Sequence, residues 1–258
     1  MLYQNSITVV ITTYNSSAHI EKSIESVLKQ TIKVNNIFII DDNSSDIFIL
    51  NEIVNKINKK SYVEIKLISN KLNKGPGFNR NHIWSKCKTE FIAFLDDDDF
   101  WYHDKLEQQL GIFKNNNNTI LVAGKKKMLK QFNTYSIKNN SYRISFKSLL
   151  FKNFIPTSSV VLKTNIKDRF LNKYYAEDYY LWLSIVNKNH NCYFINSYIC
   201  EELKDTKKEK LSSNTKEINQ NVQLVLNKFY SENFINNIFI SMAKIFYYLK
   251  RYKKKYLN

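Results

Sequence analysis

The chain has 258 residues, 43% hydrophobic and 14% aromatic, so it can bury a core and is too apolar for a disordered chain. Only four glycines and two prolines exclude a collagen-like or linker-dominated sequence. No apolar run approaches the roughly 20 residues that cross a bilayer as a helix. The first residues lack a basic region followed by a small-residue cleavage site, so we expect a protein that stays in the cytoplasm.

The net charge of +16 comes mainly from lysine, which supplies 35 of the 39 basic residues. An AT-rich genome gives such a composition, rich in lysine, asparagine and isoleucine, without selection for charge. The alternative is an anionic partner, such as a membrane surface or a nucleotide. Cys87, Cys192 and Cys200 form no CxxC pair and are odd in number, so we expect reduced thiols rather than a disulfide framework.

The first hundred residues alternate between strand and helix patterns. Short β-branched and apolar runs predict four buried strands, at residues 7–11, 37–40, 63–68 and 91–95. Apolar residues at helical spacing predict helices between them, at residues 20–28, 50–57 and 79–88. Gly75-Pro76-Gly77 breaks the chain before the last helix. Strands that alternate with helices are typical of a parallel α/β sheet.

After about residue 105 the pattern is looser. We expect further helices at 106–113 and 176–187, and strands at 120–123, 158–162 and 193–199. The charged stretch 201–216 is typical of an exposed connection. We therefore divide the chain into a domain of residues 1–215, with halves 1–105 and 106–215, and a helical segment of residues 216–258.

Polar residues follow three of the predicted strands. They are Thr12-Thr13-Tyr14-Asn15, Asp41-Asp42-Asn43 and Asp96-Asp97-Asp98-Asp99. The carboxyl ends of parallel strands meet at one edge of a sheet, where ligands bind. The sequence therefore predicts one site built from all three clusters.

The four consecutive aspartates, residues 96–99, are the sharpest feature of the sequence. Adjacent carboxylates repel one another unless a cation neutralises them, and oxygen ligands suit Mg²⁺ or Mn²⁺, with phosphate and water completing the shell. The alternative is an acidic turn that is solvated or caps the next helix. For Asp41 and Asp42, a helix cap and an acceptor for a base N–H are equally open interpretations.

Five motifs, in this order and spacing, resemble glycosyltransferase family 2. They are ITVVITTYN at 7–15, IIDDNSSD at 39–46, NKG at 73–75 with Arg80-Asn81, FLDDDDFW at 94–101, and EDYYLW at 177–182. The resemblance is strongest over residues 5–110. It implies a GT-A fold, a Rossmann-like and mostly parallel sheet flanked by helices, over residues 1–215. It also implies a nucleotide-sugar donor and inversion at the sugar's anomeric carbon.

The resemblance also implies roles for the residues that bind the nucleotide. Thr12, Thr13 and Tyr14 would hold the base, with Tyr14 stacked on it. Asp42 would accept the base N–H, which suits uracil, and Asp41 is the neighbouring alternative. Residues 1–105 would thus form the nucleotide-sugar-binding half and residues 106–215 the acceptor half.

Around the diphosphate, Arg80 would lie close to the phosphates, and Asp96-Asp97-Asp98 matches the D-x-D motif of the family. Asp98 would be the direct ligand of Mn²⁺ or Mg²⁺, while Asp96 or Asp97 contacts the ribose or a metal-bound water. Asp99 adds a fourth carboxylate, so it stays open which two of the four aspartates bind the metal ion and the ribose.

Asp178 would be the catalytic base that takes the proton of the acceptor hydroxyl. Hydrophobic neighbours can raise the pKa of a carboxyl group towards the working pH. Tyr179, Tyr180 and Trp182, with Tyr174 and Tyr175, offer such neighbours and a surface on which a sugar can stack. The alternative interpretation is a helix N-terminus that favours the acids Glu177 and Asp178 through its dipole.

The last segment carries an apolar helical stripe surrounded by lysines. The stripe comprises Ile235, Ile238, Phe239, Met242, Ile245, Phe246 and Leu249. Core packing, an oligomer interface and an interfacial helix on an anionic membrane are all open interpretations, and the last can coexist with the others. A homo-oligomer therefore also remains open.

Together these patterns predict an inverting transferase. It would move a hexose or N-acetylhexosamine from a UDP-sugar to a glycan or lipid-linked acceptor, at the inner face of a bacterial membrane. The product would be a surface polymer such as lipopolysaccharide O-antigen or capsule.

Another Mg²⁺-dependent phosphoryl or nucleotidyl transferase is the alternative, but the sequence has neither a Walker sequence nor a glycine-rich phosphate loop to support it. A basic nucleic-acid-binding module would leave the acidic strand ends unexplained, so we expect no nucleic acid partner.

Overall fold

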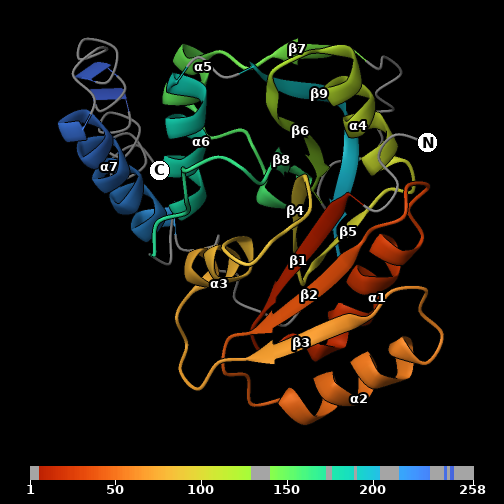
Figure 1. Ribbon diagram of the computed structural model, residues 1–258. Helices are drawn as coiled ribbons and strands as arrows, with labels where there is room; N and C mark the ends of the chain where they lie inside the picture. Colours follow the sequence, from red (N-terminus) through yellow and green to blue (C-terminus); the bar gives the residue numbers. More distant parts are fainter. Residues whose placement is uncertain are drawn as a thin grey trace.

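The computed structural model describes residues 6–128, 140–172, 176–188, 191–203, 215–232, 241–242 and 245–246. In these residues one sheet runs in the order β3-β2-β1-β4-β8-β6-β9-β5, with β7 paired to β9 (Figure 1). The strands are β1 (Ile7–Thr13), β2 (Asn36–Asp41), β3 (Ile65–Ser69), β4 (Phe91–Asp96), β5 (Asp99–Trp101), β6 (Thr119–Lys127), β7 (Ser141–Arg143), β8 (Val161–Lys163) and β9 (Asn191–Glu202).

The first four strands form the parallel half of the sheet, as their sequence patterns predict. β1 pairs in parallel with β2 and β4, and β2 pairs in parallel with β3. All seven residues of β1 are buried, because helices cover both faces of this half. The predicted α/β class and GT-A architecture are confirmed.

The second half of the sheet is mixed. β8 is antiparallel to β4 and β6, while β6 and β9 are parallel and β5 is antiparallel to β9. The strand predicted at 158–162 is partly wrong, because Thr157–Ser159 form a 3₁₀ turn, η1, and β8 begins only at Val161. The hydroxyls of this turn donate to Asp178, to Asp99 and to the carbonyl oxygen of Pro156, and such bonds favour a turn over a strand.

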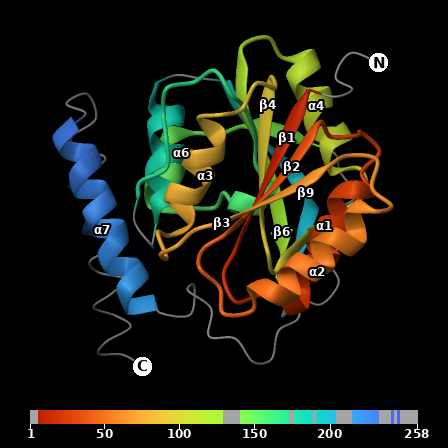
Figure 2. The same ribbon diagram turned by 60° about the horizontal axis from the view of Figure 1, so that its bottom comes forward.

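Helices cover the two faces of the sheet (Figure 2). Each face packs against its helices through a separate hydrophobic core. One face carries α1 (Ser17–Leu28), α2 (Ile47–Asn58) and α4 (Lys105–Asn115). The other carries α3 (Pro76–Trp84), α5 (Phe146–Phe151), α6 (Glu177–Asn187) and α7 (Thr215–Glu232). α3 begins at Pro76, so Gly77 lies inside this helix rather than before it.

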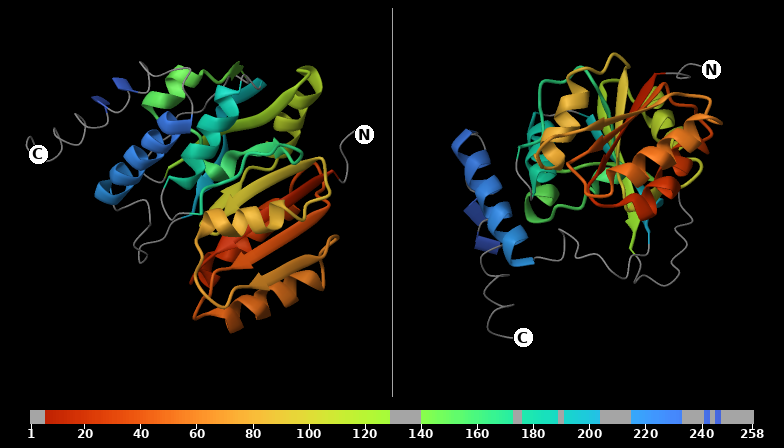
Figure 3. Two further views of the ribbon diagram at one scale, coloured as in Figure 1. Left: turned by 60° about the vertical axis from the view of Figure 1, so that its left-hand side comes forward. Right: turned by 90° about the horizontal axis from the view of Figure 1, so that it is seen from below.

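α7 lies along the outer side of α6 (Figure 3). Its buried residues Val222, Val225, Leu226 and Phe229 belong to the same core as α3, α5 and α6. Of the predicted C-terminal stripe, Met242, Ile245 and Phe246 are described and exposed, and the ring of Phe246 lies 5.8 Å from that of Phe151. The rest of the stripe and the lysines around it lie outside the described residues.

Two further expectations concern the cysteines and the membrane. Cys87, Cys192 and Cys200 are free thiols, as predicted, and the last two are buried. Within the described parts of the chain, no helix combines the length and apolarity that a bilayer crossing requires.

Candidate active site

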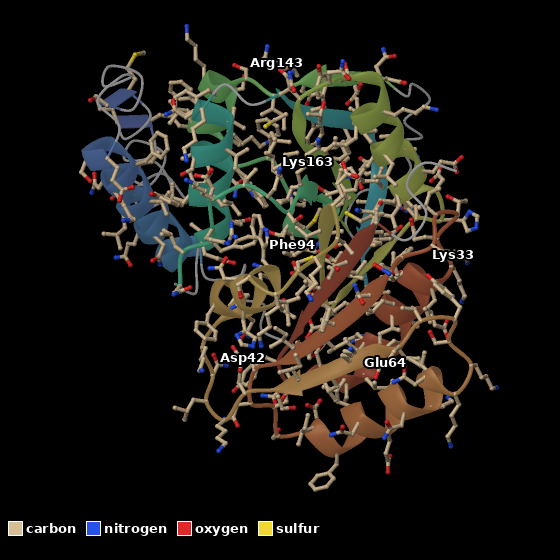
Figure 4. All side chains as sticks on the ribbon, in the orientation of Figure 1. Lys33, Asp42, Glu64, Phe94, Arg143 and Lys163 are labelled. Atoms are coloured by element: carbon tan, nitrogen blue, oxygen red, sulfur yellow. The ribbon has the colours of Figure 1, made fainter. Side chains whose placement is uncertain are left out.

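The carboxyl ends of the parallel strands lie side by side at one edge of the sheet, which we call the acidic rim (residues 12–15, 41–43 and 96–98). In register, Thr12 faces Asp96 and Thr13 faces Asp41. Figure 4 shows Asp42 where β2 ends, at this edge. The three polar clusters thus come together as the sequence predicts.

Asp42 organises the loop that follows β3. Its buried carboxylate accepts hydrogen bonds from the backbone N–H groups of Lys74 and Gly75, both at 2.8 Å, and from Asn70 Nδ2 at 3.0 Å. Asp41 is also buried, and its two oxygens accept the N–H of Ser44 at 3.2 and 3.3 Å. Both carboxylates therefore hold turns of the rim, and recognition of a base by either one stays a prediction.

The turn after β1 presents an aromatic ring at the rim. Thr12 and Thr13 are buried, whereas the side chain of Tyr14 is 47% exposed. The backbone N–H of Tyr14 donates to Asp97 Oδ2 at 3.2 Å, which ties this turn to the one after β4. A ring at this position is accessible to a planar ligand, as stacking on a base requires.

The four consecutive aspartates lie in different surroundings. Asp96 ends β4 and Asp99 begins β5, so residues 97 and 98 form the tip of a turn. The side chain of Asp99 is fully buried, where Lys126 Nζ donates at 2.6 Å and Ser158 Oγ at 2.5 Å. Asp99 is thus neutralised within the protein, and the carboxylates left at the rim are those of Asp96, Asp97 and Asp98.

The rim carries donors suited to a hard divalent cation, although it is not a complete cage. In the part of the chain that the structure describes, no three histidine, cysteine or acidic residues lie close enough together to hold a metal ion. Mg²⁺ is usually held by one or two carboxylates together with substrate phosphates and water. Asp98 and Asp96 are carboxylates of this rim, and their binding of a metal ion together with a diphosphate stays a prediction.

Arg80 connects the rim to α6. Its side chain is 5% exposed, and Nη2 donates to Asp96 Oδ1 at 2.7 Å while Nη1 donates to Glu177 Oε1 at 2.8 Å. Burial raises the pKa of Asp96, but Arg80 and Lys126 outweigh it and hold this pKa below its usual value. Because both ends of the guanidinium are occupied by carboxylates, contact between Arg80 and a diphosphate stays a prediction.

Asp178 lies at the start of α6, next to Glu177. Its carboxylate accepts hydrogen bonds from Thr157 Oγ1 at 3.1 Å and from its neighbour's backbone, Tyr179 N, at 2.7 Å. Burial raises the pKa of Asp178, while Arg80 and these hydrogen bonds lower it, and burial dominates. A raised pKa is what a carboxylate base needs near neutral pH.

The predicted stacking surface beside Asp178 is wrong for two of its residues. Tyr179 and Trp182 are fully buried, and the hydroxyl of Tyr179 donates to the carbonyl oxygens of Leu149 and Leu150. They point into the core because they lie on the buried face of α6. Tyr180 is partly exposed and hydrogen-bonds Glu232 of α7, while Tyr174 and Tyr175 lie outside the described residues.

The role of η1 is not predicted from the sequence. Thr157 bonds to Asp178, and Ser158 bonds to Asp99 and accepts the backbone N–H of Asp96 at 3.1 Å. A sequence signal exists, because three hydroxyl residues follow Pro156 directly before an apolar strand. This run of three residues is too short to distinguish from the first residues of a strand.

The fold and the rim define an α/β protein with carboxylates gathered at one edge of its sheet, linked through Arg80 and Glu177 to the partly buried Asp178. The model of the family described as "Glycosyl transferase family 2" matches residues 8–170. The chain belongs to glycosyltransferase family 2 and is a glycosyltransferase.

Several known proteins are similar to the chain. WfgD of Escherichia coli, a "UDP-Glc:alpha-D-GlcNAc-diphosphoundecaprenol beta-1,3-glucosyltransferase", is 33% identical over 203 residues, covering 73% of this chain and 74% of WfgD. WfaP of the same species, described by the same activity, is 31% identical over 70% of both chains.

Two solved structures share the fold. S. aureus TarS in complex with UDP-GlcNAc has a TM-score of 0.71 at 17% identity, covering 92% of this chain and 70% of that one. A Pyrobaculum calidifontis mannosyltransferase with GDP-Man and Mn²⁺ has a TM-score of 0.70 at 13% identity, covering 96% and 74%.

Proposed function

We propose that the protein transfers glucose from UDP-glucose, with inversion, to a saccharide linked through diphosphate to a polyprenol lipid. The names of WfgD and WfaP support both the donor and the acceptor class. A third relative, from Campylobacter jejuni and 26% identical over 189 residues, is also named as a β-1,3-glucosyltransferase acting on a diphosphate-linked undecaprenol. The product would serve the synthesis of a bacterial surface polysaccharide.

The observation that carries this proposal is the chain of hydrogen bonds from the acidic rim to the start of α6, where the proposed catalytic base Asp178 lies. Asp96 bonds to Arg80, Arg80 bonds to Glu177, and Asp178 is the next residue of the chain. A donor bound at the rim would therefore present its sugar close to the partly buried carboxylate of Asp178. Single displacement needs such proximity of the donor sugar and the base.

In the proposed mechanism, the acceptor hydroxyl oxygen attacks C1 of the sugar. The bond between C1 and the β-phosphate oxygen breaks, and its electron pair leaves with UDP. The carboxylate of Asp178 accepts the hydroxyl proton. Because attack and departure take place on opposite sides of C1, the anomeric configuration inverts.

The residues of the rim would bind the donor. Tyr14, with Thr12 and Thr13, would hold the uracil ring, and Asp42 would accept its N–H, with Asp41 as the alternative acceptor. Asp98 and Asp96 would hold Mn²⁺ or Mg²⁺, and Asp97 would contact the ribose. A bound cation would supply positive charge that stabilises the diphosphate as a leaving group.

A lipid-linked acceptor requires the enzyme to work at a membrane. We propose peripheral association at the inner face, through the apolar stripe and lysines of residues 233–258. The exposure of Met242, Ile245 and Phe246 supports this proposal.

The test is UDP release from UDP-glucose, UDP-GlcNAc and GDP-mannose, with a GlcNAc-diphosphate lipid acceptor, with and without Mn²⁺. UDP-glucose with Mn²⁺ should be the best donor. Asp178→Asn should lower kcat by about 10²–10⁴-fold, the usual contribution of a general base, while it keeps UDP binding. Asp98→Asn should weaken Mn²⁺-dependent UDP binding itself.

Asp104→Asn is the matched control, because Asp104 is exposed before α4, where it accepts a hydrogen bond from Gln108. Its rate should equal that of the wild type. Near-normal turnover by Asp178→Asn would refute the proposed base.

A further inference from the structure

Three consecutive hydroxyl residues form η1, and two of them contact the acids of the site. Thr157 Oγ1 donates to Asp178 Oδ2 at 3.1 Å. Ser158 Oγ donates to Asp99 Oδ2 at 2.5 Å and accepts the N–H of Asp96 at 3.1 Å. One turn therefore contacts the segment of the proposed metal ligands and also the proposed base.

The turn is anchored from several sides. Its three residues are at most 7% exposed. Trp101 Nε1 donates to the carbonyl oxygen of Ser158, and Gln109 Nε2 donates to that of Ser159, both at 2.7 Å. Because β5 and α4 hold its backbone, the turn can fix the position of a side chain bonded to it.

Charged groups surround Asp178 from other elements. Arg80 of α3 favours its charged form, whereas Asp96 at the end of β4 disfavours it, and Glu177 precedes it on α6. Among the described residues its hydrogen-bond donors are uncharged: Thr157, the backbone of Tyr179 and, at 3.5 Å, Asn153 Nδ2. The Thr157 hydroxyl is the closer of the two side-chain donors.

We propose that Thr157 is a positioning residue for the catalytic base, which fixes the Asp178 carboxylate at a set place relative to the acidic rim. The inference rests on the proposed function, because it assumes that Asp178 is the base. Ser158 holds the same turn to Asp96 and Asp99. A change that displaces the whole turn therefore affects the base and the rim together, whereas loss of the Thr157 hydroxyl removes a hydrogen bond to the base alone.

The hydrogen bond from Thr157 to Asp178 determines the direction in which the pH profile of activity should shift when the hydroxyl is removed. A hydroxyl that donates to a carboxylate stabilises its charged form, so its removal raises the pKa of the base. A base acts only when deprotonated, so the acidic limb of the pH profile moves to higher pH. For one hydrogen bond to a charged group, the shift should be about one pH unit.

Thr157→Val tests this, because valine keeps the shape of threonine and lacks the hydroxyl. Its kcat/KM should fall about tenfold on the acidic limb and recover at high pH, which corresponds to the shift of about one unit. Thr157→Ser keeps the donor and should retain the wild-type limb. Thr157→Ala is a second variant without the donor, in case valine disturbs folding.

Thr164→Val is the matched control, since the Thr164 hydroxyl donates to the backbone oxygens of Thr89 and Glu90 rather than to Asp178. It should leave the pH profile unchanged. The proposal is overturned if Thr157→Val and Thr157→Ala keep the wild-type limb, or if their loss is equal at every pH.

Asp178→Asn separates this inference from the proposed function. If Asp178→Asn is inactive and Thr157→Val shows no shift, only the role of Thr157 fails. If Asp178→Asn remains active, the proposed base fails, and the inference fails with it.

Discussion

Arg80 holds two carboxylates at once, one from each half of the domain. Its guanidinium bonds to Asp96 and Glu177 with a side chain that is 5% exposed. Lysine carries the same charge at a single point and cannot form this fork. Arg80→Lys should therefore leave one buried carboxylate poorly paired, at a cost of about 1.5–3 kcal/mol in the free energy of unfolding.

Urea denaturation and kcat measure the effect of this variant. Arg143→Lys, at an exposed arginine of β7, should change neither quantity. Adding Glu177→Gln to Arg80→Lys should recover part of the stability, because it removes the carboxylate left unpaired. Equal stability of Arg80→Lys and Arg143→Lys would show that the fork is not needed.

At the same scale, the sequence could predict that residues 96–99 form an acidic cluster, but not which of them faces the ligand. That depends on where distant residues lie. Asp99 is buried because Lys126 and Ser158, 27 and 59 residues further along the chain, meet it inside the protein. The same holds for Arg80, whose partner Glu177 is 97 residues away.

At the scale of elements, α3 and the start of α6 approach each other closely at Gly77. A Cβ atom on Gly77 would lie 2.1 Å from the carbonyl oxygen of Leu171 and 2.9 Å from Glu177 Cγ. Gly77→Ala should push α3 away from these residues, lower stability by about 1–3 kcal/mol and reduce kcat. Thermal unfolding and UDP release measure both effects.

Gly111 of α4 provides the control, because a Cβ atom there would meet nothing within 4 Å. Gly111→Ala should raise stability by about 0.5–1 kcal/mol, since alanine favours a helix over glycine. A Gly77→Ala protein as stable as Gly111→Ala would contradict the close approach.

Elements with a strong local pattern were predictable, and short ones were not. The parallel strands carry β-branched or other apolar residues, and the prediction places them within two residues of their observed limits. β5 and β7 have three residues each, too few to show a period, and both depend on pairing with β9. Their existence depends on tertiary contacts rather than on local sequence.

At the scale of the whole molecule, the place of α7 decides how the last segment relates to the domain. The predicted boundary at residues 215–216 separates this helix from the sheet. In the structure its buried face packs on α6, and the ring of Phe229 lies 5.8 Å from Phe146 and 6.3 Å from Tyr180. A helix packed in this way should unfold together with the domain.

Leu226 and Leu224 test this on the same helix. Leu226 is fully buried, whereas Leu224 is 53% exposed. Leu226→Ala should cost about 2–5 kcal/mol and lower the midpoint of a single thermal transition, because it leaves a cavity in the shared core. Leu224→Ala should stay within about 0.5 kcal/mol of the wild type. A separate transition for α7, or a midpoint that Leu226→Ala leaves unchanged, would show that the helix folds apart from the domain, as the boundary at residue 215 implies.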